Sequence, residues 1–152
     1  MGIMNYAKKL MPGIGLSTDI ITGFPTEREE DHKMTIDLLE EVEYDGAYTF
    51  AYSPRENTKS YRMTDDVPME VKVRRLDEII HVQRKVSARI YKNMVGRTEE
   101  VLIESNSKKS DDYLMGRTDC NKSVILPKGN NKTGDLVNVK IVKSNSATLF
   151  AE

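Results

Sequence analysis

Residues 15–31, GLSTDIITGFPTEREED, predict a buried strand that leads directly into a helix. The first part of this stretch is rich in apolar and β-branched side chains, which favour the pleated conformation of a strand. Gly15 and Gly23 bracket the strand as turn residues. Thr26 and Glu29 then have the spacing of a capping box, which predicts that a helix begins near Thr26.

The predicted helix carries a stripe of side chains that can pack on a sheet. The stripe consists of Thr35, Leu38, Leu39 and Val42. The acidic residues of segment 27–31 are expected in the first turn, where they complement the helix dipole. After the helix, residues 47–54 (AYTFAYSP) predict a second strand. Strand, helix and strand form a βαβ unit, from which parallel sheets are built.

This βαβ unit lies close to the start of the sequence. A further strand and its crossover would need about a dozen residues or more, and the residues before Gly15 are too few to provide them. Two parallel strands cannot fill a doubly wound sheet or close a barrel, so we expect further strands of this domain upstream. Residues 4–12, MNYAKKLMP, fit the tail of a preceding helix that Pro12 ends. The alternative is a small complete α+β domain whose strands pair differently.

The composition is that of a soluble globular protein, with 152 residues of which 38% are hydrophobic and 31% charged. The apolar runs are too short for a membrane span and the N-terminus lacks a signal-peptide pattern, so we expect a cytoplasmic protein without a membrane partner. Cys120 is the single cysteine and cannot form an internal disulfide or a Cys-based metal site by itself. His32 and His81 stand isolated on predicted helices, as surface or internally satisfied side chains. The net charge of −1 argues neither for nor against nucleic-acid binding.

A long helix is predicted to link the two halves of the chain. Asp65 and Asp66 precede it, Pro68 fits its first turn, and Gly96 is suited to end it. Its apolar positions recur with helical spacing at Leu76, Ile79, Ile80, Val86 and Ile90. Its other face is basic, with Lys72, Arg74, Arg75, Arg84, Lys85, Arg89 and Lys92. These cations could contact phosphates, or they could form an ordinary solvated face.

From Thr98 onward the hydrophobic pattern changes to the two-residue period of β-strands. Five short runs are separated by polar or glycine-containing turns: TEEVLIE, YLMGRT, KSVILP, DLVNVKIVKS and ATLFA. The pattern predicts a separate domain, a small five-stranded antiparallel barrel of the OB-like kind. Barrels of this kind commonly bind nucleic acid through one face and its loops.

Several consecutive motifs resemble the C-terminal half of the MiaB-type tRNA methylthiotransferases. They are LSTDIITGFPTEREED, YTFAYSPR, DDVPMEVKVRRLDEII, SKKSDDYLMGRTDCNKSVILP and GDLVNVKIVKSNSATLFAE. The resemblance implies an α/β domain followed by an all-β domain. Residues 1–93 resemble the end of a radical S-adenosylmethionine (SAM) (β/α) barrel, which is incomplete in this chain. Residues 94–152 resemble a TRAM domain, a small RNA-binding β-barrel.

The resemblance implies an enzyme that adds a methylthio group to a hypermodified adenosine beside the tRNA anticodon. The implied partner is the tRNA anticodon stem-loop, and the implied cofactors are SAM and two 4Fe–4S clusters. The family holds each cluster with three cysteines, one set lying in a C-x3-C-x2-C loop, and this sequence contains neither set. We therefore expect this chain to hold no cluster, and to be inactive without the missing N-terminal part of the same polypeptide.

No catalytic or metal-binding residue is assigned in this chain. The resemblance implies that five residues at the two strands and their carboxyl ends face the SAM and substrate cavity, namely Ser17, Thr18, Asp19, Ser53 and Arg55. It implies RNA contacts for five residues of the barrel, namely Lys108, Lys109, Arg117, Asn121 and Lys122. The alternatives are a structural role for the Asp19 carboxylate and a solubilising role for the loop cations.

The sequence departs from the family at two loop glycines. Residues 25–27 are PTE where the family usually has PGE, and residues 55–58 are RENT where it usually has RPGT. Loss of a glycine at such a turn can change the loop conformation. Two other functions stay open: a stand-alone RNA-binding module without catalysis, and an unrelated small α/β enzyme that uses Asp19 and Arg55.

Overall fold

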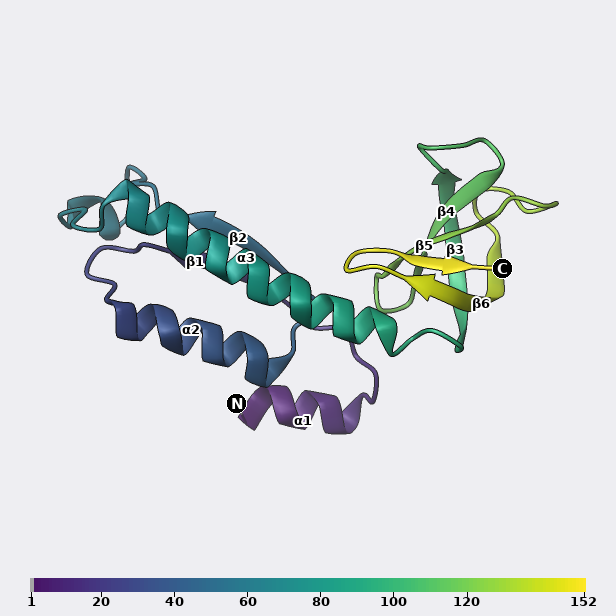
Figure 1. Cartoon of the computed structure of the whole chain (residues 1–152), viewed down its shortest axis with the longest axis horizontal. Coiled ribbons are helices and arrows are strands. Elements are labelled where there is room, and N and C mark those ends of the chain that lie inside the picture. The colour runs from purple at the N-terminus through teal and green to yellow at the C-terminus, as the bar shows by residue number, and fades with distance from the viewer. Residues whose placement is uncertain (1) are drawn as a thin grey trace. The chain divides into compact units, whose positions relative to one another are not determined.

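The computed structural model describes residues 2–152, which divide into two compact units. Residues 16–86 form the α/β unit, and residues 87–152 with the N-terminal segment up to Gly15 form the barrel unit. Figure 1 shows the helices and strands of both units. In chain order they are α1 (Gly2–Leu10), β1 (Ser17–Thr22), α2 (Glu29–Val42), β2 (Gly46–Ala51), the 3-10 turn η1 (Ser60–Arg62), α3 (Met69–Lys92), β3 (Thr98–Asn106), β4 (Tyr113–Thr118), β5 (Ser123–Pro127), β6 (Leu136–Ser144) and β7 (Leu149–Ala151).

β1 and β2 are parallel neighbours in a two-stranded sheet. Their register pairs Asp19 with Tyr48 and Ile21 with Phe50. α2 connects them, because two parallel strands need a crossover that returns the chain to the starting edge of the sheet. The predicted βαβ unit is therefore confirmed.

The two faces of this sheet have different environments. Side chains alternate between the faces along each strand. Thr22 of β1 is buried on one face. On the other face Ile21 is exposed, together with Tyr48 (69% exposed) and Phe50 (53%) of β2. We call this second face, with Ile21, Tyr48 and Phe50, the open face.

The two helices of the α/β unit each bury apolar side chains. Leu39 and Val42 of α2 and Ile79 of α3 are almost completely buried. The Gln83 amide of α3 donates a hydrogen bond to the Tyr44 carbonyl oxygen at 2.8 Å, just after α2. Burial of each large aliphatic side chain stabilises the unit by about 1.5–3 kcal/mol.

α2 begins at Glu29, later than the predicted start near Thr26. The Asp31 carboxylate accepts a hydrogen bond from the Arg28 N–H at 2.8 Å and forms the capping box, so the predicted pairing of Thr26 with Glu29 is wrong. The predicted packing of Leu38 on the sheet is also wrong, because this side chain is exposed. The buried residues of α2 are His32, Leu39 and Val42.

The long helix predicted between the two halves of the chain is confirmed as α3. The Pro68 carbonyl oxygen accepts the first hydrogen bonds of the helix, and Gly96 has the left-handed conformation (φ = 91°) suited to the turn that follows it. α1 ends at Leu10, shortly before Pro12, as predicted. Among residues 2–152, no helix is both long and apolar enough to cross a membrane.

The five predicted β runs form a closed barrel with the strand order β3-β4-β5-β7-β6 (Figure 1). Four neighbouring pairs are antiparallel, whereas β5 and β7 are parallel. The prediction of an entirely antiparallel barrel is therefore corrected at this one pair. The reason is the number of strands. In a closed ring of five strands, neighbours cannot all alternate in direction, and β7, which pairs with both β5 and β6, is antiparallel to β6 and therefore parallel to β5.

The barrel encloses a hydrophobic core of inward-facing strand residues, and the end of α3 adds Tyr91 and the following loop adds Met94. The strand residues in this core are Val101, Ile103, Leu114, Val124, Leu126, Val139, Ile141, Leu149 and Ala151. Gly116 lies where β4 passes close to β3. A Cβ atom at this position would lie 2.5 Å from the Leu102 carbonyl oxygen, so only glycine fits.

Candidate functional site

The carboxylate of Glu27 organises the loop between β1 and α2. It accepts hydrogen bonds from the N–H groups of Gly23 at 2.8 Å and Phe24 at 3.3 Å, and from the Thr22 hydroxyl at 3.3 Å. Arg75 of α3 donates to this carboxylate at 2.8 Å and to the Glu27 carbonyl oxygen at 3.1 Å. Glu27 therefore ties the loop to α3 and does not lie in the first turn of α2, where the sequence predicted it.

A second cation of α3, Lys72, lies against the loop that follows β2. Its side chain is 1% exposed, and its ammonium donates to the two carboxylate oxygens of Asp65 at 2.6 and 2.7 Å. The ammonium lies 5.1 Å from the centre of the Tyr52 ring, within the range of a cation–π interaction. Gly23 passes directly over the aliphatic stem, since a Cβ atom there would collide with Lys72 Cγ.

The basic residues of α3 therefore differ in their surroundings. Lys72 and Arg75 are buried in ion pairs, which excludes them from contact with phosphates and corrects the prediction of a uniformly accessible basic face. Arg84, Lys85 and Lys92 are exposed, as the predicted solvated face requires. Removing one partner of a buried ion pair costs about 3–5 kcal/mol, so the two buried cations hold both loops firmly in place.

A cluster of charged residues joins α2 to α3. Arg74 donates to Glu29 at 2.7 Å and to Glu78 at 2.8 Å, and Glu78 also bonds to the Nε2 atom of His32 at 2.7 Å. The hydrogen bond from Arg74 lowers the pKa of Glu29 to about 2, and the bond to His32 is the largest cause that lowers the pKa of Glu78. Glu78 thus satisfies the Nε2 atom of His32, whereas the Nδ1 atom is buried without a hydrogen-bond partner in the described part of the chain. The ligand atoms of Glu29, His32 and Glu78 lie within 4.8 Å of one another, but the Arg74 cation already compensates both carboxylates, so we assign the cluster to helix packing.

The predicted SAM-facing residues occupy β1 and the segment after β2. Ser17 and Asp19 are exposed on the open face, whereas Thr18 is half-buried on the opposite face. Ser53 and Arg55 are exposed just beyond the carboxyl end of β2. In the described part of the chain, no hydrogen bond or ion pair joins Asp19 to Arg55, so the arrangement offers no support for an enzyme built on that pair.

Two loop residues have the left-handed backbone conformation at the positions where the family usually has glycine. Thr26 has φ = 72° and Asn57 has φ = 67°. Asparagine tolerates this conformation, whereas a β-branched residue is strained by about 1–2 kcal/mol. The Thr26 N–H donates to the Asp66 carboxylate at 2.7 Å and joins the two loops. Both loops therefore keep a glycine-type shape without the glycine.

The predicted RNA-contacting residues lie at opposite ends of β4. Lys108 and Lys109 belong to the loop before this strand, whereas Arg117, Asn121 and Lys122 lie at its carboxyl end and in the next turn. A strand of six residues is about 20 Å long, so the two groups cannot bind the same phosphate. The five predicted RNA-contacting residues therefore form two separate groups in the structure.

In the second group, Arg117 and Lys122 already interact with other residues of the protein. Arg117 donates to the Glu104 carboxylate at 3.2 Å and to the backbone and side-chain oxygens of Asn121 at 3.1 Å each. Lys122 is 5% exposed and is engaged inside the protein. Burial removes the Lys122 ammonium from the set that can reach an RNA phosphate.

The first group has further cationic and aromatic neighbours. The Lys128 N–H donates to the Asp112 carbonyl oxygen at 2.9 Å and brings loop 128–134 beside loop 107–112. Tyr113 is half-exposed at the start of β4, opposite Pro127 of β5. We call these two loops with Tyr113 the loop end. The sequence analysis did not single out Tyr113 and Lys128, because only the pairing of β4 with β5 brings them close to Lys108 and Lys109. The register expected for a β4–β5 hairpin is the sequence signal that could have identified them.

Comparison with known proteins identifies a family for the barrel and relatives for almost the whole chain. Residues 92–152 match the TRAM domain family. The chain is 52% identical over 144 residues to the tRNA-2-methylthio-N(6)-dimethylallyladenosine synthase of Chloroherpeton thalassium, which covers 94% of this chain and 32% of that protein. It is 47% identical over 146 residues to the synthase of the same name from Bacteroides thetaiotaomicron, covering 95% of this chain and 32% of that protein.

The corresponding synthase of Chlorobium phaeobacteroides is 49% identical over 146 residues, covering 95% of this chain and 33% of that protein. The chain thus spans about a third of the length of the curated relatives it matches. The predicted resemblance to the MiaB-type tRNA methylthiotransferases is therefore confirmed along almost the whole chain, and the barrel of this chain is a TRAM domain.

Proposed function

We propose that this chain is the C-terminal part of a tRNA methylthiotransferase, in which the barrel binds tRNA and the α/β unit forms part of a radical SAM barrel. The observation that carries the proposal is the 47–52% identity to such synthases over 94–95% of the chain. The TRAM domain supports the RNA-binding part. The proposed substrate is a tRNA that carries a hypermodified adenosine beside the anticodon.

The loop end has the chemistry that RNA binding requires. Lys108, Lys109 and Lys128 are exposed cations, and each cation that neutralises a phosphate releases a bound counterion. Tyr113 offers an exposed ring on which an unpaired base can stack, a contact worth about 1–3 kcal/mol. We place the backbone of the anticodon stem-loop on this surface.

The open face supports the role of the α/β unit. Parallel sheets are normally covered on both faces, yet the aromatic rings of Tyr48 and Phe50 are exposed here. In a (β/α) barrel the helices cover the outside of the sheet, and the other face lines the interior. We propose that residues 1–93 belong to such a barrel, with Asp19 in the cavity for SAM and substrate and with Ser53 and Arg55 at its rim.

The residues of this chain do not fit an iron–sulfur cluster. Cluster irons are held by several cysteine thiolates, and Cys120 is the single cysteine of the sequence. Its thiol donates to the Gly13 carbonyl oxygen at 3.1 Å, and burial raises its pKa, which disfavours the thiolate. The proposed contribution of this chain is therefore to bind RNA and to line the cavity.

RNA binding is tested by fluorescence anisotropy of a labelled anticodon stem-loop at several salt concentrations. We expect Lys108→Ala/Lys109→Ala to reduce the slope of log K against log salt concentration by about 1.4, since each single-strand phosphate contact contributes about 0.7. Lys140→Ala/Lys143→Ala removes the same charge from β6 and is the matched control. Absence of binding, or equal loss in both variants, would contradict the proposal.

The sequence alone predicts that Lys109→Ala and Arg117→Ala both weaken binding. The structure sharpens this expectation, because the Arg117 guanidinium is already bound by Glu104 and Asn121. We expect Lys109→Ala to weaken RNA binding more than Arg117→Ala in the same titration.

A stand-alone RNA-binding module is the second candidate, and the closure of the barrel on its own strands favours it. The two candidates differ in catalysis. We expect a chimera of the preceding part of the Chloroherpeton thalassium synthase with this chain to add methylthio groups to tRNA, measured by mass spectrometry of the nucleosides. A folded chimera that binds SAM but modifies no tRNA would favour the second candidate.

A further inference from the structure

The loop between β2 and α3 is held in one conformation by its own side chains. The Thr58 hydroxyl donates to the Arg55 carbonyl oxygen at 2.7 Å and accepts a hydrogen bond from the Tyr61 N–H at 3.2 Å. The Tyr52 hydroxyl donates to the Ser60 carbonyl oxygen at 3.1 Å. Because these bonds fix the turn in advance, a ligand that binds it need not order the loop.

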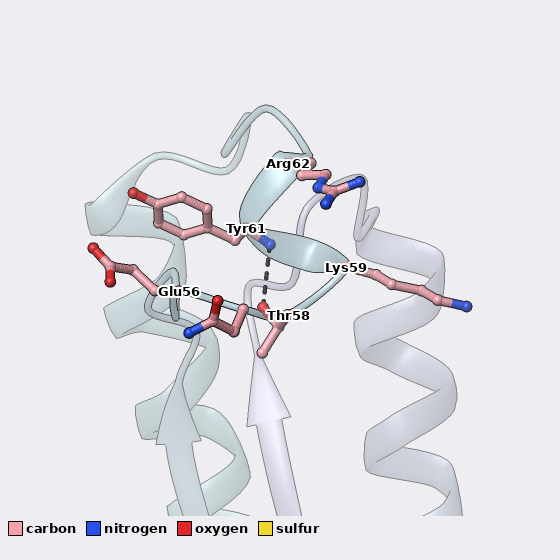
Figure 2. A pocket seen from close by; sticks show the side chains of 6 residues that line it. Glu56, Thr58, Lys59, Tyr61 and Arg62 are labelled. Atoms are coloured by element: carbon pink, nitrogen blue, oxygen red, sulfur yellow. Dashed lines mark hydrogen bonds between the residues drawn. The ribbon is translucent and has the colours of Figure 1, made fainter.

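Lys59 and Arg62 extend from one side of this turn. Lys59 directly precedes η1 and Arg62 is its last residue, so they are three positions apart. Side chains three positions apart eclipse one another in a 3-10 helix. Figure 2 shows Lys59 and Arg62 pointing away from Glu56 and Tyr61.

The acidic groups near the end of the same loop are occupied elsewhere. Asp65 is bound by the buried Lys72, and Asp66 accepts the Thr26 N–H. Within residues 2–152, neither Lys59 nor Arg62 has a carboxylate partner. The turn therefore presents two uncompensated positive charges on a fixed backbone.

The two cations belong to the wall of a hollow of about 590 Å³. The other lining residues are Glu56, Asn57, Thr58 and Tyr61 (Figure 2). A guanidinium binds a phosphate through two parallel hydrogen bonds, and an ammonium adds a compact charge beside it. The hollow is larger than one phosphate group.

We propose that Lys59 and Arg62 bind a phosphate of the tRNA strand next to the nucleotide that is modified. The loop follows the carboxyl end of β2, the edge at which parallel α/β folds bind their ligands. A base has to leave its stack to reach an enzyme cavity, and a fixed phosphate beside it limits the positions it can then take. The inference rests on the proposed function, because it requires that the α/β unit receives a tRNA strand.

The test compares two double variants of the α/β unit with equal charge changes. Lys59→Ala/Arg62→Ala removes the proposed contact, and Arg84→Ala/Lys85→Ala removes one lysine and one arginine from the exposed side of α3. In anisotropy titrations with the anticodon stem-loop, we expect the first variant to reduce the salt slope by about 1.4 and the second to leave it unchanged. Thr58→Val keeps both charges but removes the hydroxyl that fixes the turn, and we expect it to weaken binding by less than the first variant.

Equal slopes for the two double variants would overturn the inference. A loss confined to Lys108→Ala/Lys109→Ala would overturn it as well, while RNA binding by the loop end would stand. A loss confined to Lys59→Ala/Arg62→Ala would support the inference and contradict the RNA-binding role of the loop end. Saturable NMR shifts of Lys59 and Arg62 with inorganic phosphate, without any effect of the variant on RNA binding, would assign the turn to a small phosphorylated ligand instead.

Discussion

The strands of the barrel are paired on both edges, whereas each strand of the α/β sheet is paired on only one edge in the described part of the chain. In the barrel every strand has two neighbours, and Val101, Leu114 and Ile141 are 0–1% exposed. In the described part of the α/β unit each strand has one neighbour, and the open face leaves Tyr48 and Phe50 exposed. We infer that the barrel is a self-contained module, whereas the open face is a surface that becomes interior when further chain covers it.

The largest expected effect comes from truncating side chains in the two regions. We expect Ile141→Ala to destabilise the barrel by about 2–5 kcal/mol, because it leaves a cavity in a closed core. Phe50→Ala removes a larger but exposed side chain and should change stability by less than about 0.5 kcal/mol. Urea denaturation followed by the NMR signals of each unit measures both values, and similar losses in the two variants would refute the contrast.

The next effect concerns the buried ion pair of the α/β unit. Asp65→Ala leaves the Lys72 ammonium buried without its partner and should cost about 3 kcal/mol. Lys72→Met leaves a carboxylate that is one-third exposed and can be solvated, so we expect a loss of about 1 kcal/mol. The same denaturation measurement tests the order, and a greater loss for Lys72→Met would show that packing of the lysine stem outweighs charge.

A smaller effect is expected at the two left-handed loop residues. Thr26→Gly should stabilise the α/β unit by about 1 kcal/mol, because it removes the strain of a β-branched residue at φ = 72°. Asn57→Gly is the matched control and should change stability by about zero, since asparagine accepts this conformation. A thermal shift of the same size and sign in both variants would argue against strain at Thr26.

The smallest effect is the pH dependence of the contact between α2 and α3. The pKa of Glu29 is lowered by folding from 4.5 to about 2, so its contribution to stability is present above pH 4.5 and is lost as the pH falls toward 2. The residue is exposed, so added salt should weaken the effect. We expect Arg74→Met to flatten the stability curve between these pH values, and an unchanged curve would show that the pair contributes nothing measurable.

The comparison also shows which parts of the fold the sequence predicts. The 3.6-residue pattern locates α2 and α3 and the two-residue pattern locates the barrel strands, because each reflects burial of one face, whereas β1 and β2 are found from their β-branched and aromatic residues and the turn residues beside them. The sequence does not predict that Lys72 and Arg75 are buried, although they lie at helical spacing from Leu76 and Ile79. A search for apolar stripes alone misses them, since a buried cation becomes favourable only when a distant carboxylate reaches it.

The candidate site is less predictable than the fold. Lys108 and Lys122 both lie in turns beside β4, yet one is exposed and the other is buried. Periodicity within a strand does not determine which turn residue folds inward. Tyr113 and Lys128 belong to the loop end only because β4 pairs with β5 and the two loops meet. Local sequence patterns do not contain this strand pairing.

Native-state hydrogen exchange of this chain tests the contrast between the two units most directly. We predict that the amides of Val101, Leu114 and Ile141 exchange only when the whole barrel unfolds, and that the amides paired between β1 and β2 exchange at a clearly lower free energy. Equal protection of the two-stranded sheet and the barrel would contradict the account, because it would show that the open face needs no further cover.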